Sequence, residues 1–491
     1  MIQLIKVTIA WVFLLALWLP MATSQKVTNS GTEFWLAFPE MFDRNTTNSD
    51  YWLNITSNTS AAGTVTIPGT SFSAPFSVTP GAIAKVNLPR NDVYLNGSDS
   101  IFNRAIHVSS NNEVVVYAVH LKRPRHEATL VLPNRALGPD YRITTYRSEQ
   151  IGATLYESEF VVVATGDTAV VEIVPTGDIA GGPLKGVPYQ ITLLPGEVYQ
   201  AQALADSVDL TGTTIKSVNG KNVAVYAGNV WIQVVCNGAR DPLLEVMYPT
   251  NTWGKSYFAL PTPLVLKDYI KVLADEDTTI LFRDGVFVDT LNAGEFFEDT
   301  IITNRHYTAN KPISVAEVLV SGGGPVGCNS YNLTDPSMVM LNPTEQMFLD
   351  SISFFAVDDP SAQLDTNFVH VVTFSTDTAL VFLDSVKLGG FQQFTQDPKY
   401  SFRSIGVKAG FHRLETKGCG FLAYSMGMGN IISYAYATGV SLVDLDNAIT
   451  FTNAIDGSDT ICLGDTVQFK SVSFANAFSF IIFMFVRGCI E

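Results

Sequence analysis

Residues that form reactive centres are scarce in this sequence. It has five cysteines and six histidines among 491 residues, and no two cysteines form a C-x-x-C pair. A zinc site needs clustered thiolate or imidazole ligands, so this scatter argues against one. The motifs G-x-S-x-G, H-E-x-x-H, G-x-G-x-x-G and the P-loop are missing from the contexts in which they work. The sequence therefore predicts no metal and no cofactor, and it favours a protein that is not an enzyme.

Positive charge is also in short supply. The chain has 30 lysines and arginines against 46 aspartates and glutamates, which gives a net charge of −16. Nucleic-acid binding requires a large basic face, and the densest basic cluster here is the short segment 122–126. We therefore expect no nucleic-acid partner.

Long hydrophobic runs are missing except near the N-terminus, which has the parts of a secretory signal. Lys6 precedes an apolar run from Val7 to Leu19, and small residues precede Gln25. That run is too short to span a bilayer. We predict that residues 1–24 are a signal peptide and that the mature chain begins at Gln25 without a transmembrane segment. The protein is then secreted or held at the cell surface.

No stretch keeps a helical period, but one β-rich block of about 100 residues occurs four times. Each block opens on an alternating apolar run, and turn pairs such as Asp284-Gly285 punctuate its short strands. This pattern predicts an all-β fold of tandem antiparallel β-sandwich-like repeats. Whether the blocks stack in a line or close into a ring is left open. The predicted blocks span about 51–140, 160–257, 269–347 and 368–439.

A second repeat marks the junctions between blocks. Asp241–Pro249 and Asp335–Pro343 match in spacing, and Arg125–Pro133 is a looser copy. Gly138 stands five residues after Pro133, and Gly254 stands five residues after Pro249. A tyrosine follows each glycine, at Tyr141 and Tyr257. Because proline fixes φ and removes a hydrogen-bond donor, we expect each junction to end a strand and direct the chain into the next block.

These junctions, together with the opening segment Gly31–Pro39, resemble the N-terminal domain of IgGFc-binding proteins. The resemblance covers about residues 30–440, and we assign residues 25–440 to such a domain. It implies an exported binding module whose partner is an extracellular protein or glycoprotein. A family name does not carry one ligand to every member.

The C-terminal segment, residues 441–491, shows a smaller resemblance. Asp459–Phe469 is similar to the first strand of the PKD-like, immunoglobulin-like repeats of Bacteroidota. The aromatic strand and turn that should follow are replaced by an apolar run at 478–486. We interpret residues 441–491 as a linker and a truncated PKD-like domain.

Two sets of residues suggest local sites. Cys236 and Cys328 occupy equivalent positions beside successive junctions, so they are candidates for a disulfide that would contribute roughly 4 kcal/mol; the alternative is two separate buried thiols. The acidic pairs Asp275/Asp277 and Asp444/Asp446 offer oxygen ligands to calcium, but acidic turns are common in exported β proteins.

Other residues have a functional and a structural interpretation. Glu245 and Glu345 would serve glycoside hydrolysis only if the fold brought them together. Trp231 and Trp253 suit either recognition or packing between blocks, and we favour packing. The histidines that fall in strand runs are interpreted as satisfied or solvent-facing side chains rather than catalytic bases: His107, His370 and His412.

The predicted function is a non-enzymatic binding or adhesion module that recognises an extracellular protein or glycoprotein. Its binding surface would use loops at the ends of the blocks or strand edges. One alternative is a structural spacer of a large surface protein. A carbohydrate-active enzyme ranks below both, and no catalytic, cofactor or metal residue is assigned.

Overall fold

The computed structural model describes residues 27–42, 48–122, 125–235, 238–323, 334–357 and 364–446, together with two short C-terminal strands. Those strands, β36 (Thr450–Asn453) and β37 (Val467–Lys470), pair antiparallel with each other. Strand β37 falls in the segment that resembles a PKD-like repeat. The predicted signal peptide, residues 1–24, lies outside the described residues.

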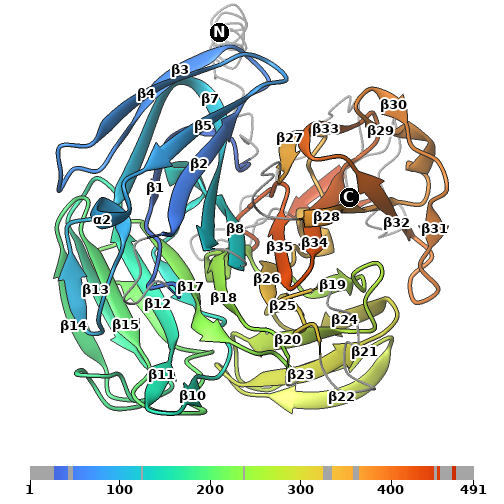
Figure 1. Ribbon diagram of the computed structural model, residues 1–491. Helices are drawn as coiled ribbons and strands as arrows, with labels where there is room; N and C mark the ends of the chain where they lie inside the picture. The colour runs from blue at the N-terminus through green and yellow to red at the C-terminus, as the bar shows by residue number, and fades with distance from the viewer. Residues whose placement is uncertain are drawn as a thin grey trace, which may run out of the picture.

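Four antiparallel β-sandwiches are arranged around a common centre, each made of an inner and an outer sheet (Figure 1). The predicted all-β fold of tandem sandwich-like repeats is thus confirmed. The alternating apolar run that opens each block forms a largely buried strand of an inner sheet: β2 (Asp50–Thr56), β12 (Ser158–Ala164), β20 (Asp268–Ala274) and β28 (Leu364–Phe374).

The first sandwich is held together by one long strand, β7 (Ile106–Lys122). Its first part pairs with β1 and β3 in the outer sheet, and its second part pairs with β2 and β8 in the inner sheet. The remaining strands of this sandwich lie before or after β7: β1 (Gly31–Leu36), β3 (Ala61–Thr66), β4 (Ser73–Val78), β5 (Ile83–Leu88) and β8 (Arg125–Val131). A short helix, α2 (Arg90–Val93), follows β5.

The second sandwich takes one strand from the sequence of the first block. Strand β6 (Ser100–Phe102) pairs with β15 at the edge of the second inner sheet, in the order β18-β17-β12-β15-β6. The outer sheet has the order β14-β13-β16-β9, and the hairpin β10-β11 stands beside the pair. The strands are β9 (Asp140–Arg142), β10 (Glu149–Ile151), β11 (Thr154–Tyr156), β13 (Ala169–Val174), β14 (Tyr189–Leu193), β15 (Val198–Gln202), β16 (Thr214–Ser217), β17 (Val223–Ile232) and β18 (Asp241–Val246).

The third and fourth sandwiches repeat the same strand order. Their inner sheets are β23-β20-β25-β26 and β31-β32-β28-β34-β35, and their outer sheets are β19-β24-β21-β22 and β27-β33-β29-β30. The strands of the third are β19 (Ser256–Ala259), β21 (Thr279–Arg283), β22 (Val286–Leu291), β23 (Phe296–Ile301), β24 (Arg305–Ala309), β25 (Ile313–Leu319) and β26 (Ser337–Met340). Those of the fourth are β27 (Ser351–Ala356), β29 (Val381–Leu383), β30 (Val386–Lys387), β31 (Gln392–Gln393), β32 (Tyr400–Val407), β33 (Gly410–Thr416), β34 (Phe421–Gly429) and β35 (Ile432–Ala437).

The junctions that repeat in the sequence form the centre of the molecule. Strand β8 contacts β18, β18 contacts β26, β26 contacts β35, and β35 returns to β8 (Figure 1). Each of the first three is followed within three residues by a proline that precedes a one-turn 3-10 helix: η1 (Asn134–Ala136), η2 (Thr250–Thr252) and η3 (Thr344–Gln346). The four sandwiches therefore close into a ring. Each junction does end a strand and lead into the next sandwich, and the strand itself is buried.

The two ends of the ring are joined by hydrogen bonds between its first and last residues. The Asn29 amide donates to the Val440 carbonyl at 3.1 Å, and the Leu442 amide donates to the Val27 carbonyl at 2.7 Å. The buried Tyr117 hydroxyl adds a bond to the Thr438 carbonyl at 2.5 Å. Chain ends far apart in sequence thus stabilise each other by closing the ring.

A glycine packs against a proline at three successive junctions. A Cβ atom on Gly31, Gly138 or Gly254 would lie 2.4, 2.8 or 2.4 Å from the Cβ of Pro133, Pro249 or Pro343, respectively. Real side chains do not approach this closely, so only glycine fits these positions. The repeated glycines and prolines are therefore explained as close packing between neighbouring sandwiches.

Candidate functional site

Matched positions of the sequence repeat meet at the centre of the ring. Thr129 and Glu245 each stand four residues before their junction proline, and the Thr129 hydroxyl donates to Glu245 Oε2 at 2.6 Å. Glu127 and Ser337 each stand six residues before theirs, and the Ser337 hydroxyl donates to Glu127 Oε2 at 2.9 Å. Positions that match in the sequence repeat thus occupy corresponding places around the centre of the ring, which we call its axis.

The centre is also acidic and buried. Burial raises the pKa of Glu245 to about 8, and it raises the pKa of Glu127 well above its usual range, with the Glu245 and Asp335 carboxylates adding to the effect. Burial likewise raises the pKa of Asp241, which Asp335 and Glu127 raise further. Burial thus disfavours the charged form of these carboxyls, which suits packing rather than the binding of a cation.

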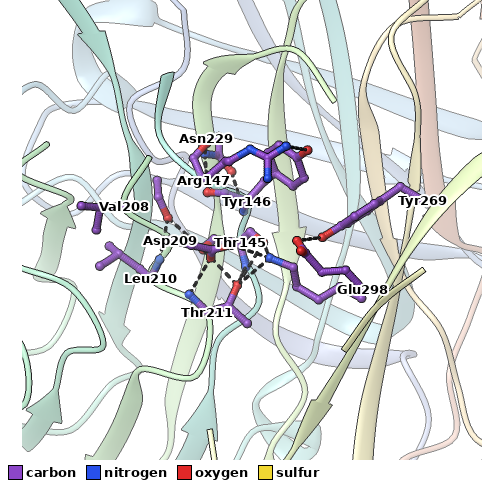
Figure 2. A network of polar contacts seen from close by, with 12 residues as sticks. Thr145, Tyr146, Arg147, Val208, Asp209, Leu210, Thr211, Asn229, Tyr269 and Glu298 are labelled. Carbon is purple, nitrogen blue, oxygen red and sulfur yellow. Dashed lines mark hydrogen bonds and ion pairs between the residues drawn. The ribbon is translucent and has the colours of Figure 1, made fainter. Parts of the chain in front are cut away.

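A polar network joins the second and third sandwiches. The Lys271 ammonium, on β20, donates to Asp209 Oδ2 at 2.5 Å, to the Thr145 carbonyl at 2.9 Å and to the Thr211 hydroxyl at 3.2 Å. Figure 2 shows Asp209, Thr145 and Thr211 close together, where the Thr145 hydroxyl and the Thr211 amide both donate to Asp209 Oδ1. The Lys271 Nζ also lies 4.2 Å from the centre of the Phe296 ring. Burial alone would raise the pKa of Asp209, but the Lys271 ammonium outweighs it and lowers that pKa.

A second ion pair crosses the same boundary. Arg142, at the end of β9, donates from Nε to Asp275 Oδ1 at 2.8 Å and from Nη1 to the Gly212 carbonyl at 3.3 Å. Gly212 has a φ of +90°, and a Cβ there would lie 2.3 Å from the Gly294 carbonyl oxygen. The Arg142–Asp275 ion pair and the close approach of Gly212 to Gly294 thus fix how the second and third sandwiches meet. The space between the two sandwiches therefore has a defined shape.

That space is a cleft of about 750 Å³. The second sandwich contributes the end of β13, the loop that follows it and the stretch 209–214, while the third contributes the end of β22 and the start of β23. Both polar and apolar side chains line the cleft, including Arg142, Lys185, Asp209, Asp289, Glu295 and Phe296. A volume of this size between two packed sandwiches is typical of a binding site.

A family model described as IgGFc binding protein matches residues 127–427, which extends from the first central strand into the last inner sheet. The chain belongs to the IgGFc-binding protein family. It is similar to the human protein named IgGFc-binding protein, with 24% identity over 469 residues. The alignment covers 92% of this chain but only 8% of the human protein, so the chain spans a small part of that relative's length.

The family signature and the cleft occupy different parts of the molecule. The junction prolines and glycines hold the ring together, whereas the cleft is built from loops and strand ends away from the axis. Sequence reasoning missed Arg142, Asp209 and Lys271, because nothing in the linear pattern joins residues so distant in the chain. The one signal in the sequence was Lys271, a lysine within the otherwise apolar run 269–274 of β20, because a buried ammonium needs an acidic partner.

The acidic residues considered for calcium have other partners. Asp275 pairs with Arg142, and Asp277 Oδ1 accepts a bond from the Ala293 amide at 2.9 Å. Asp446 lies near enough to Asp444 and Asp275 that their charges add to burial in raising its pKa. No group of three or more His, Cys, Asp or Glu side chains in the described part of the chain is arranged to hold a metal ion.

The two glutamates considered as a catalytic pair have separate partners. Glu245 Oε1 accepts a hydrogen bond from the Met340 amide at 3.2 Å in the centre of the ring. Glu345, in η3, accepts one from the Lys255 amide at 2.8 Å. Since each carboxylate serves a local contact, the hypothesis of glycoside hydrolysis gains no support from this geometry.

The tryptophans pack as expected. Trp253 is buried, and its indole N–H donates to the Tyr248 carbonyl at 3.1 Å. Trp231 stacks on Phe42 with ring centres 4.4 Å apart, and its indole N–H donates to the Arg240 carbonyl.

The three strand histidines also have structural partners. His107 stacks on Trp35. His370 contacts the Ser404 hydroxyl, and burial lowers its pKa to about 4. His412 contacts Asp384 at 2.7 Å.

The predicted disulfide between Cys236 and Cys328 stays a prediction, because both residues lie outside the described part of the chain. Cys419 is disulfide-bonded. Peptide mapping without reduction would test the pairing, and a Cys236–Cys419 or Cys328–Cys419 peptide would contradict it. Within the described residues, no helix is both long and apolar enough to cross a membrane.

Proposed function

We propose that this chain is a non-enzymatic, extracellular binding module, with residues 25–440 forming the module and residues 1–24 directing export. The observation that carries the proposal is membership of the IgGFc-binding protein family over residues 127–427. The partner is an extracellular protein or glycoprotein. We further propose that the chain is a bacterial family member and that a PKD-like segment follows the module.

The architecture supports this proposal. Four sandwiches locked by Gly–Pro contacts and buried ion pairs give a rigid scaffold, on which loops hold their shape before a partner arrives. Binding to a preorganised surface loses less conformational entropy than binding to flexible loops. The cleft between the second and third sandwiches is the largest candidate contact surface described above.

A binding assay with the purified chain tests the proposal. The chain is immobilised, and a panel of secreted glycoproteins that includes the Fc fragment of IgG is passed over it while binding is recorded by interferometry. The Fc fragment is included because the human relative is named for it. We expect saturable binding of at least one panel member, and the soluble chain should compete for it.

Two outcomes would contradict the proposal. Failure to bind any panel member would favour the structural spacer instead. Release of reducing sugars from a glycan panel incubated with the chain would favour an enzyme.

A further inference from the structure

One loop breaks the symmetry of the ring. The equivalent outer-sheet hairpin is closed by residues 67–72 in the first sandwich, by Asp284-Gly285 in the third and by Asp384-Ser385 in the fourth. In the second sandwich the same connection, between β13 and β14, runs through residues 175–188. In repeat proteins, an insertion confined to one repeat commonly forms part of the binding face.

The long loop is held in one conformation by its own hydrogen bonds. The Lys185 amide donates to Asp178 Oδ1 at 2.8 Å, and the Gly186 amide donates to the Pro175 carbonyl at 2.8 Å. Ala180 fixes the loop to the sheet, because its amide donates to the Gln202 carbonyl at 2.9 Å. The loop is therefore preorganised, although it projects from the sandwich.

The tip of this loop exposes apolar side chains. Leu184 is 61% exposed and Val187 is 49% exposed, while Ile179 in the same loop is buried and anchors it. Two exposed aliphatic side chains on a loop held in one conformation give a partner apolar area to pack against at little entropic cost.

The same loop forms one wall of the inter-sandwich cleft. Val174, Pro175, Thr176, Lys185 and Gly186 line the cleft on the loop side. The opposite wall comes from the third sandwich, at 289–291 and 293–296. Leu184 and Val187 directly precede and follow the cleft-lining residues Lys185 and Gly186 in the chain.

The charges of the cleft favour a basic occupant at the wall formed by the third sandwich. Arg142 is neutralised by Asp275, and Asp209 is neutralised by Lys271. Asp289 and Glu295 are exposed, and their carboxylates accept hydrogen bonds from the backbone amides of Thr290 and Asn292, respectively. The two carboxylates therefore lie on the wall formed by the third sandwich, while Lys185 supplies one positive charge on the loop side.

We propose that the β13–β14 loop and the adjoining cleft bind a protein segment that carries an apolar side chain next to a lysine or arginine. The apolar side chain packs on Leu184 and Val187, and the basic one enters the cleft toward Asp289 and Glu295. The net charge of −16 attracts such a segment at long range. This inference rests on the proposed function, since it assigns that binding to one site.

The test uses the mature full-length chain and a phage-displayed library of random dodecapeptides. We expect the selected peptides to share a Lys or Arg beside an apolar residue. The double variant Leu184→Ser/Val187→Ser should bind them about tenfold more weakly. Asp289→Asn/Glu295→Gln should bind them more weakly at low salt and should lose most of the salt dependence.

Matched controls separate this site from others. Val386→Ser changes an equally exposed aliphatic residue at the equivalent hairpin of the fourth sandwich, and Glu172→Gln removes a carboxylate of β13 outside the cleft; both should bind as wild type does.

Three results would overturn the inference: selection of no peptide, selection of peptides without a basic residue, or binding by either double variant that equals that of wild type. If a panel glycoprotein still binds in those cases, the proposed function survives and this site is wrong. Binding that instead depends on the partner's glycans assigns the cleft to a carbohydrate.

Discussion

The buried Glu245 carboxyl predicts that the ring loses stability as the pH rises. Glu245 is fully buried at the axis, and burial raises its pKa from 4.5 to about 8. The folded state therefore holds this proton more tightly than the unfolded state does. The stabilisation is complete below the unfolded pKa of 4.5 and is lost as the pH rises toward the folded value of about 8.

The size of the effect follows from that interval. Each pH unit between the two pKa values removes about 1.4 kcal/mol from the free energy of unfolding. A change from pH 5 to pH 7 should therefore remove roughly 3 kcal/mol through this one group. Glu127 and Asp241 have pKa values shifted in the same direction, whereas the lowered pKa of the buried His370 makes stability rise with pH between about 4 and 6.5, so the effect of Glu245 has to be isolated by substitution.

The variant Glu245→Gln isolates the contribution of this group, because glutamine has a similar shape but cannot ionise. Urea unfolding at pH 5, 6, 7 and 8, monitored by tryptophan fluorescence, gives the free energy of unfolding at each pH. Over pH 5 to 7 the variant should lose roughly 3 kcal/mol less stability than wild type. Glu172→Gln, a surface change on β13, should follow the wild-type curve.

Two results would refute this reasoning. One is a pH dependence in Glu245→Gln that equals that of wild type. The other is a stability loss from pH 5 to pH 7 that is larger in Glu245→Gln than in wild type, because that would require the folded state to favour the ionised Glu245 carboxyl.

Two further substitutions test the contacts that hold the ring. Gly254→Ala places a Cβ against Pro343 and should lower the free energy of unfolding by roughly 1–3 kcal/mol. Gly389→Ala, whose Cβ would meet no atom within 4 Å, should change that free energy little, and equal effects of the two variants in urea unfolding would contradict the role of the Gly–Pro contact. Lys271→Met leaves Asp209 buried without its cation and should lower the free energy of unfolding by roughly 3–5 kcal/mol. Adding Asp209→Asn should restore part of that stability, and no recovery in the double variant would show that the unpaired Asp209 is not the cause of the loss.

The sequence allowed the strands to be predicted because their signals are local. The alternating run at Tyr269–Ala274 and the turn pair Asp284-Gly285 specify a strand and a hairpin without help from distant residues. Membership of the family was also visible, because the Gly–Pro spacing of the junctions is written directly in the chain. The sequence did not show which glycine packs against which proline, because Gly254 meets Pro343, the proline of the next junction along the chain.

The candidate site was not predictable in the same way. Asp275 was noticed as an acidic turn residue and interpreted as a possible calcium ligand, whereas its partner is Arg142 from the preceding sandwich. The long β13–β14 loop is visible in the sequence, but only comparison with the other three hairpins shows that it is an exception. Ion pairs across a boundary depend on which faces meet, and the periodicity of one strand carries no information about that.

The sequence by itself determined the all-β class, the four blocks and the repeated junction, because each follows from local alternation, turn residues and spacing. Only the tertiary structure decided that the junctions are buried central strands, that the four sandwiches close into a ring, and that a cleft opens between the second and third. The physical reason is that side-chain alternation fixes which face of a strand is apolar, while the neighbour that covers that face is chosen by packing around the whole ring.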